Sequence, residues 1–256
     1  MKKRYYFPLL LTAIAIALPL RGASAGDIPG LVLYLSFDEQ KPVDHSADPA
    51  EVLVHGNFSQ AAGQFGMAAE FDGASYLEVP HMDKLDGMDA LTIEAWIKPD
   101  IVGEGMSIAS KRIANTSGDS YNFFIWTGNR LSGRINASPD LWSVTVLDSG
   151  KWYHVAYVFD GNAPAADNQQ IYVDGVLEST GSNSNQSVPS NNSPLWISEL
   201  DSSRGFFWSG LIDELGIWEK ALNEDEVLLA MDGNLKALSV EPQNKLTAKW
   251  GEIKER

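Results

Sequence analysis

The chain has 256 residues, a formal net charge of −15 and no cysteine. The lack of cysteine excludes disulfide bonds, thiolate metal sites, a cysteine nucleophile and a lipoprotein anchor. The excess of carboxylates argues against nucleic acid or anionic membranes as partners, because both bind basic surfaces. The charge suits cations or neutral ligands such as glycans, and it also suits the simpler role of keeping an exported protein soluble.

The N-terminus has the features of a secretory signal peptide. Residues 1–4 (MKKR) are basic, residues 5–20 are mostly apolar, and Ala23-Ser24-Ala25 offers small residues for cleavage. A membrane anchor fits less well, because Pro8 and Pro19 interrupt an apolar run that is short of a full span. Residues 1–25 are therefore predicted to be removed on secretion, to the periplasm or outside the cell.

Cleavage after Ala25 removes four basic residues and no acidic ones, so the mature chain carries −15 − 4 = −19. No later segment is apolar enough to cross a bilayer. We expect one large β domain over residues 26–233, followed by an appendage of unknown role at residues 234–256.

Short segments of alternating polarity, separated by turn-forming residues, recur along the domain. They lie at residues 31–37, 68–71, 76–79, 91–98, 121–126, 131–136, 152–159, 170–173, 195–198 and 211–218. This spacing predicts an all-β sandwich or barrel. A helix is predicted only for residues 223–231, because Asn223 is a good N-cap, acidic residues follow it and Gly233 lies just past the end.

Two turn signals predict the register of hairpins. Asp174-Gly175 suits a type I′ turn, and Gly128-Asn129 can form a second two-residue turn that pairs Thr127 with Arg130. With this second turn, the core face holds Phe124, Trp126, Leu131 and Ile135. The opposite face then holds Tyr121, Phe123, Arg134 and Asn136. A slip of one residue would exchange the two faces.

Seven segments together resemble the laminin G-like, concanavalin A-like superfamily of lectins and glucanases. They are LVLYLSFD (31–38), GMAAEFDG (66–73), YLEVP (76–80), LTIEAWIKP (91–99), KWYHVA (151–156), IYVDG (171–175) and GLIDELGIW (210–218). Their order and spacing match over about residues 30–230. The resemblance implies a jelly-roll sandwich of two antiparallel sheets. It does not determine the function, because this fold supports many functions.

Catalysis is not expected. Laminarinase-type enzymes with this architecture carry the pattern Glu-x-Asp-x-x-Glu, whose two glutamates perform retaining hydrolysis. The nearest match is residues 199–204 (ELDSSR), where Arg204 replaces the second glutamate. Glu94 has no partner carboxylate two residues away. His154 is interpreted as a hydrogen-bonded residue of the sheet, and the other histidines lack the spacing of a zinc site.

The resemblance also implies a bound calcium ion where the first and last strands lie side by side. Carried over to this sequence, Asp213 would supply a carboxylate, while Asp38 and Gly73 would supply mainly backbone carbonyl oxygens. Asp72 and Glu214 are secondary candidates. Such an ion requires six to eight oxygen ligands. The alternative is that Asp213 accepts hydrogen bonds from backbone donors at a strand end.

Glycan recognition needs an aromatic platform beside amides and charged groups. The hairpin face with Tyr121, Phe123, Arg134 and Asn136 offers this combination. Residues of neighbouring loops extend it: Arg112, Asn115 and Trp142. The alternative is that these side chains pack beneath a loop or against the other sheet. Trp208 is expected in the core.

We therefore expect a secreted lectin-like module that binds carbohydrate or a glycosylated surface and is stabilised by calcium. A protein-interaction or adhesion domain without glycan specificity is the alternative, and a polysaccharide-processing enzyme is a weaker one. An exposed aromatic among polar groups would favour the lectin, and a broad apolar patch would favour adhesion. Two carboxylates facing each other in a cleft would favour the enzyme.

Overall fold

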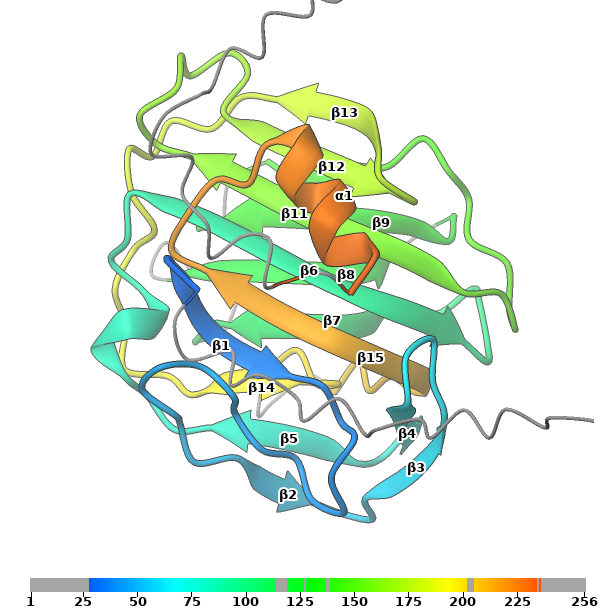
Figure 1. The fold of residues 1–256 in the computed structure, drawn as a ribbon. Helices are drawn as coiled ribbons and strands as arrows, with labels where there is room; N and C mark the ends of the chain where they lie inside the picture. Colours follow the sequence, from blue (N-terminus) through cyan, green and yellow to red (C-terminus); the bar gives the residue numbers. More distant parts are fainter. Residues whose placement is uncertain are drawn as a thin grey trace, which may run out of the picture.

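Strands of alternating polarity form two antiparallel sheets that pack face to face (Figure 1). The computed structural model describes residues 28–113, 119–126, 128–136, 139–201, 205–233 and 235. Residues 1–25, the predicted signal peptide, lie outside this range, and Leu235 alone is described in the predicted appendage. No helix in the described part of the chain is long and apolar enough to span a membrane.

The first sheet has eight described strands. Its order is β13 (Val176–Gly181), β12 (Gln169–Val173), β11 (Tyr153–Asp160), β6 (Ala90–Pro99), β15 (Ser209–Trp218), β4 (Met67–Asp72) and β3 (Ser59–Ala62), and β1 (Leu31–Leu35) also pairs with β15. Strand β15 pairs with β4 over its first half and with β1 over its second half. An irregularity between Asp213 and Gly216 marks the position where the neighbour changes.

The second sheet has seven described strands. Its order is β10 (Leu141–Trp142), β9 (Arg130–Ile135), β8 (Tyr121–Trp126), β7 (Met106–Lys111), β14 (Leu195–Ile197), β5 (Tyr76–Val79) and β2 (Leu53–His55). A short 3₁₀ helix, Asp83–Leu85, follows β5. The sandwich fold and its antiparallel sheets are confirmed.

The core lies between the two sheets. In β6 the predicted inward set, Leu91, Ile93, Ala95 and Ile97, is fully buried. Trp208 is also fully buried, as predicted. Because alternate side chains of a strand point to opposite faces, each sheet retains an outer face with its own side chains.

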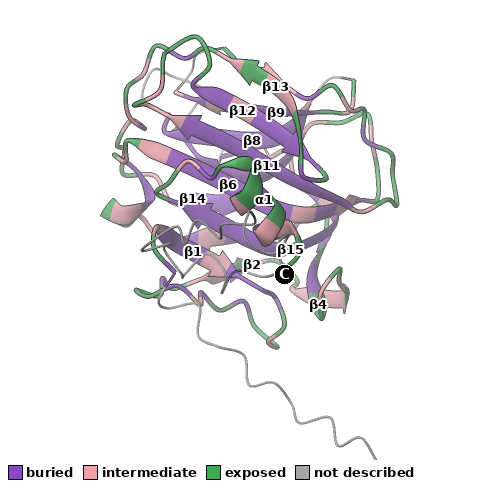
Figure 2. Cartoon of the chain, turned by 45° about the horizontal axis from the view of Figure 1, so that its top comes forward, coloured by how far each residue is buried: buried purple, intermediate pink, exposed green. Residues whose placement is uncertain are grey.

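The outer face of the first sheet is covered by the helix α1 (Glu224–Met231), which lies across β12, β11 and β6 (Figure 1). Asn223 caps α1 through a reciprocal capping box with Glu226, as the sequence predicts for its N-terminus. Val227 and Ala230 pack onto Ala156 and Trp218, and Figure 2 shows the buried strands beneath exposed residues of the helix. The outer face of the second sheet is crossed instead by a loop that carries Phe206 and Phe207.

Candidate functional site

The hairpin of β8 and β9 has a different register from the predicted one. Trp126 pairs with Arg130, so three residues separate the last paired positions, in place of the two that were predicted. Asn129 donates its backbone N–H to the Trp126 carbonyl at 3.1 Å and adopts a left-handed backbone, with φ of 57°. Asparagine tolerates this conformation, and a three-residue hairpin often ends in it. The two-residue turn prediction was therefore wrong by one residue.

This shift reverses the faces of β8. Tyr121 and Phe123, predicted to bind a ligand, are fully buried in the core, where the Phe123 ring stacks on Tyr157 with 6.1 Å between centroids. Phe124 and Trp126, predicted to lie in the core, project to the outer face. Leu131 and Ile135 lie in the core, as predicted. Tyr121 and Phe123 are therefore not accessible to a ligand.

A pocket of about 180 Å³ opens on the outer face of the second sheet. It is lined by Arg112, Phe124, Trp126, Arg134, Asp140, Leu200 and Phe206. The Trp126 and Phe206 rings are 4.9 Å apart, and the Phe124 ring lies 6.3 Å from Trp126. Three aromatic rings thus form an apolar wall beside charged groups.

The position of Phe206 is fixed by its backbone. Phe206 has a positive φ of 60°, which is uncommon for a bulky residue and persists where the surroundings enforce it. Its carbonyl accepts a hydrogen bond from the Ser107 N–H of β7 at 2.8 Å. The loop is therefore attached to the sheet, and its aromatic ring is held over Trp126.

Arg134 is positioned by its neighbours on the sheet. Its guanidinium lies 5.9 Å from the Phe124 ring centroid and 3.3 Å from Asp140 Oδ1. The Asn122 amide is oriented so that its oxygen faces hydrogen-bond donors and its nitrogen faces acceptors. In this orientation the amide oxygen accepts hydrogen bonds from Arg134 Nε and Nη2 at 2.9 and 3.1 Å. The same amide donates to Ser110 Oγ at 2.6 Å. Arg134 is thereby held in one orientation at the edge of the pocket.

Arg112 is buried at the inner end of the pocket. Its Nε lies 3.0 Å from Asp201 Oδ2 and 3.6 Å from Asp119 Oδ2. Glu199 lies two residues before Asp201 in the sequence. Burial raises the pKa of Glu199 to about 7, with further contributions from the charges of Asp201 and Glu78. Burial and these two negative charges therefore disfavour the ionised form of Glu199.

Of the six residues predicted to bind a ligand, the structure brings only Arg112 and Arg134 to the pocket. Asn136 donates its backbone N–H to the Ser120 carbonyl, and its side chain contacts Asn185. Trp142 lines a separate shallow depression with Gly128, Arg130 and Val146. Asn115 lies outside the described residues.

Sequence reasoning missed Phe124, Trp126, Asp140, Leu200 and Phe206 as pocket residues. The only local signal for Phe206 was an aromatic run, residues 206–208, within a polar loop.

A second aromatic cluster occupies the same outer face over β5. The His55 ring stacks on Tyr76 with 4.5 Å between centroids and an interplanar angle of 9°, and His55 Nε2 lies 2.8 Å from Glu78 Oε2. Phe207 lies 5.9 Å from Tyr76. The adjacent residues Phe206 and Phe207 therefore connect the pocket to this cluster.

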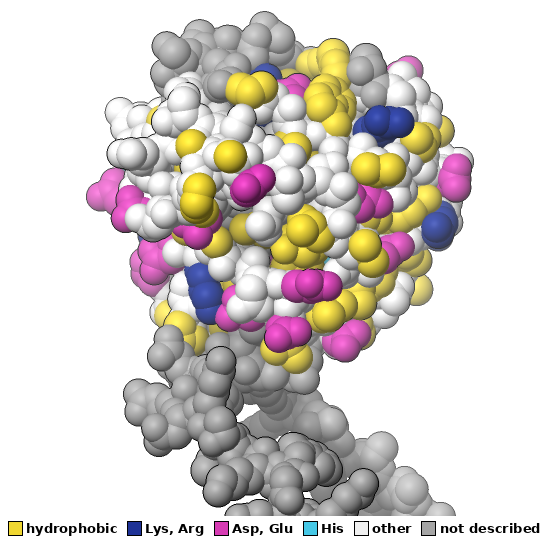
Figure 3. Space-filling view, turned by 90° about the horizontal axis from the view of Figure 1, so that it is seen from above, with side chains coloured by type: hydrophobic (Ala, Val, Ile, Leu, Met, Phe, Trp, Pro, Cys, Tyr) yellow, Lys and Arg dark blue, Asp and Glu magenta, His cyan; other side chains and the backbone are white. Residues whose placement is uncertain are grey.

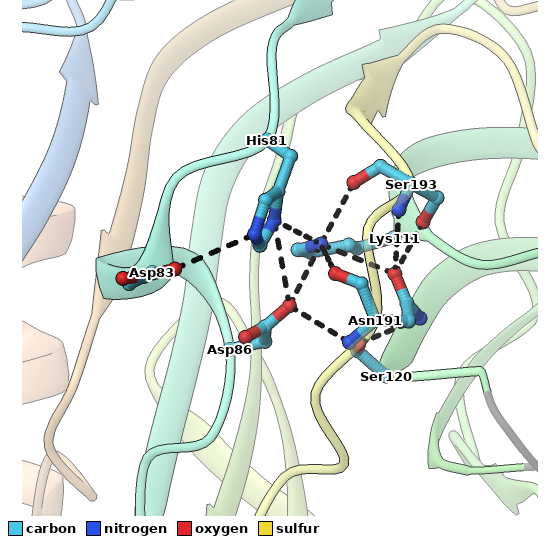
Figure 4. A network of polar contacts seen from close by, with 7 residues as sticks. All are labelled: His81, Asp83, Asp86, Lys111, Ser120, Asn191 and Ser193. Atoms are coloured by element: carbon cyan, nitrogen blue, oxygen red, sulfur yellow. Dashed lines mark hydrogen bonds and ion pairs between the residues drawn. The ribbon is translucent and has the colours of Figure 1, made fainter.

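A polar network at the end of β7 surrounds the buried ammonium of Lys111 (Figure 4). Its Nζ contacts Asp86 Oδ2 at 2.8 Å, the Asn191 and Ser193 carbonyls at 2.8 and 2.7 Å, and His81 Nδ1 at 3.2 Å. Burial lowers the pKa of Lys111, and Asp86 opposes this shift. The network joins the segment before β6 to the loop before β14, so its role is structural.

The three predicted calcium ligands do not meet. Asp213 Oδ2 accepts hydrogen bonds from the Gln64 and Phe65 N–H groups at 2.8 and 2.9 Å, and Asp38 Oδ1 accepts from Met67 N–H at 2.8 Å. These contacts lie at the start of β4, whereas Gly73 follows its far end. At about 3.3 Å per residue, six strand residues separate them by about 20 Å.

The predicted trio of Asp38, Gly73 and Asp213 is therefore wrong as a single site. Asp213 instead satisfies backbone donors of the turn before β4, which was the alternative interpretation of this residue. Among the described residues, no group of three or more acidic or histidine side chains is placed to hold a metal ion. Calcium binding itself stays a prediction.

Buried acids occupy the outer face of the first sheet next to β1. His154 Nε2 lies 3.2 Å from Glu94 Oε2, so His154 is a paired residue of the sheet, as predicted. Tyr34 donates its phenolic O–H to Glu214. Burial raises the pKa of Glu214 to about 8 although the Tyr34 hydrogen bond lowers it, and the charges of Asp213, Glu94 and Asp38 add to the rise. Burial also raises the pKa of Asp213 to about 7.

Solved structures with the same fold include several binding domains. Domain 4 of AbnA, an extracellular arabinanase from Geobacillus stearothermophilus solved with arabinotriose, is 22% identical, with a TM-score of 0.61 over 79% of this chain and 98% of that domain. The binding domain of Paraclostridial Mosquitocidal Protein 1 is 18% identical, with a TM-score of 0.65 over 80% of this chain and 52% of that one.

Botulinum neurotoxin type C, whose cell entry depends on two ganglioside molecules, is 15% identical, with a TM-score of 0.61 over 80% of this chain and 51% of the other. This chain thus spans about half the length of the toxin chains it matches. At these identities the likeness shows the fold alone.

No curated protein sequence matches the chain significantly. The family profile described as the concanavalin A-like lectin/glucanases superfamily, of laminin G type, matches residues 71–228, which is more than half of the chain. The chain therefore belongs to the laminin G-type family of the concanavalin A-like lectin/glucanases superfamily.

Proposed function

We propose that this protein is a secreted carbohydrate-binding module that holds a saccharide in the pocket of Phe124, Trp126 and Phe206. The observation that carries the proposal is the wall of three aromatic rings on the outer face of the second sheet. Domain 4 of the arabinanase was solved with arabinotriose, which supports a saccharide ligand on this fold.

The chemistry of the pocket suits a sugar ring. Aromatic rings pack against the apolar C–H face of a pyranose or furanose, while Arg134 and Asp140 are placed to donate to and accept from its hydroxyls. The volume of about 180 Å³ is below that of a typical small-molecule site, about 300–1,000 Å³. One sugar ring would therefore enter, and the remaining rings of an oligosaccharide would lie outside.

The proposal does not include catalysis. Hydrolysis of a glycosidic bond generally needs two carboxyl groups flanking the bond. Asp140 is the one carboxylate among the lining residues that the structure describes. Export rests on the signal-peptide pattern of residues 1–25, and the extracellular arabinanase domain is consistent with it.

A glycan-array screen of the purified chain, followed by calorimetric titration with the best glycan, tests the proposal. Trp126→Ala and Phe206→Ala should each weaken binding about two- to twelvefold, because a stacked aromatic contact contributes about 0.5–1.5 kcal/mol. Trp142→Ala is the matched control, because Trp142 is a half-buried tryptophan outside the pocket. An array without any bound glycan would contradict the proposal, as would a loss of binding in Trp142→Ala but not in Trp126→Ala.

A protein-interaction domain is the second candidate, and it rests on exposed aliphatic side chains near β13. Val144, Val146 and Val176 are among the most exposed large hydrophobic residues. Glu178 of β13 accepts hydrogen bonds from the Val144 and Thr145 N–H groups, so this loop lies beside the strand. Figure 3, seen from the β13 side, shows hydrophobic groups separated by acidic and other polar side chains. These separate groups make a weaker binding surface than the pocket.

A further inference from the structure

Both arginines at the pocket are already paired with carboxylates. Arg134 Nη1 lies 3.3 Å from Asp140 Oδ1, with side chains only 12% and 22% exposed. Arg112 Nε lies 3.0 Å from Asp201 and 3.6 Å from Asp119, and all three side chains are at most 2% exposed. Each arginine of the pocket is thus already engaged by at least one carboxylate.

A ligand carboxylate that binds Arg134 would lie beside Asp140, which already pairs with this guanidinium. The two carboxylates would repel each other in a partly buried site, or Asp140 would lose its partner there, and either outcome opposes binding. The pKa of Glu199 is raised mainly by burial and then by the charge of Asp201, so an added negative charge beside Asp201 is also disfavoured. The net charge of −15 adds long-range repulsion of anions.

A neutral saccharide avoids these costs. Its hydroxyls can donate to Asp140 Oδ2 and accept from Arg134 while the ion pair stays intact, because a carboxylate and a guanidinium each have several hydrogen-bonding positions. The aromatic wall supplies the same contact to a neutral or an acidic sugar, so it does not discriminate between them.

We infer that the pocket selects neutral saccharides over those carrying a carboxylate, and that Asp140 is the residue that determines this selectivity. This inference rests on the proposed saccharide-binding function. In this pocket a partly buried carboxylate of the chain itself already pairs with the arginine that an acidic glycan would contact.

The test compares pairs of glycans that differ only by a carboxylate. The best neutral oligosaccharide from the array, and its analogue with a uronic acid in place of the corresponding neutral sugar, are titrated against the purified chain. The neutral member should bind about tenfold or more tightly, the size of one charge-assisted hydrogen bond. Asp140→Asn should bring the two affinities close together, because it removes the negative charge beside Arg134 that opposes the uronic acid. Asp167→Asn, which removes an exposed carboxylate outside the pocket, should leave the ratio unchanged.

The outcomes separate this inference from the proposed function. Tighter binding of the acidic member by the wild type would overturn the neutral selectivity while leaving saccharide binding intact. An equal change of the ratio in Asp140→Asn and Asp167→Asn would show that net charge, not Asp140, sets the preference. Absence of binding to any glycan would overturn the proposed function itself. The wild-type comparison remains decisive where a variant folds poorly.

Discussion

Phe123 and Trp126 lie on the same strand, three residues apart, yet alanine should affect them in different ways. Phe123 is 0% exposed, lies in the core and stacks on Tyr157. Removing a buried phenylalanine leaves a cavity and costs about 3–5 kcal/mol of unfolding free energy. Trp126 is half-buried on the outer face and contacts Phe124 and Phe206. Its removal should cost about 1 kcal/mol, the size of an aromatic pair contact, and should weaken saccharide binding.

Urea unfolding followed by circular dichroism measures both free energies, provided that the slope m is unchanged between variants. Phe123→Leu is the control, because a substitution that roughly conserves volume should cost less than about 1.5 kcal/mol. At urea concentrations below its unfolding midpoint, the Phe123→Ala variant should still bind the glycan, because the Phe123 side chain does not reach the pocket. A loss of about 3–5 kcal/mol in Trp126→Ala with little change in Phe123→Ala would refute the register and remove the pocket from the outer face.

The buried acids predict two further results. The pKa of Glu214 is raised from 4.5 to about 8, so the stability that this shift contributes is fully present below about pH 4.5 and is lost as the pH rises through 8. The melting temperature should therefore fall from pH 5 to pH 8.5, and the raised pKa of Asp213 adds to this fall. Glu214→Gln should make the melting temperature less dependent on pH. A melting temperature that rises over this range would contradict the raised pKa of Glu214. Asp213→Ala should lower the melting temperature equally in millimolar calcium and in chelator, because the Asp213 carboxylate accepts hydrogen bonds from backbone N–H groups. A melting temperature lowered only in the presence of calcium would show that Asp213 binds the ion.

The fold could be predicted because many local signals agreed. The strand alternation, the asparagine cap of α1 and the order of seven family segments each pointed to the same sandwich. In β6 the alternation is strict, so the inward set was right at every position. Such agreement does not depend on the position of any single turn.

The register of the β8 hairpin could not be predicted, because both faces of β8 are apolar. Tyr121, Phe123 and Ile125 alternate with Asn122, Phe124 and Trp126, so either set could face the core. Polarity decides only on β9, where Leu131 and Ile135 were placed correctly. The face of β8 then depended on the length of the turn, and one residue more in the turn exchanged its two faces.

The pocket itself depends on segments that meet only in the folded chain. Leu200 follows β14 and Phe206 lies in the loop before β15, so no sequence spacing links them to Arg134, whereas Asp140 lies only six residues after it. The calcium trio failed for the opposite reason. Asp38, Gly73 and Asp213 were related by family position, but the length of β4 holds Gly73 about 20 Å from the other two.

The two arginines show why composition alone does not predict the charge of a ligand. In the sequence, Arg112 and Arg134 are cations near aromatic residues, a pattern that suits an anionic sugar as well as a neutral one. In the structure, each arginine pairs with an aspartate that no sequence motif identifies as its partner. Asp201 pairs with Arg112, and Asp140 pairs with Arg134. An arginine attracts a ligand anion less when a carboxylate of the chain already pairs with it, and here Asp201 is fully buried with Arg112 while Asp140 is partly buried with Arg134. The chemistry of the pocket therefore follows from its ion pairs rather than from its positive residues.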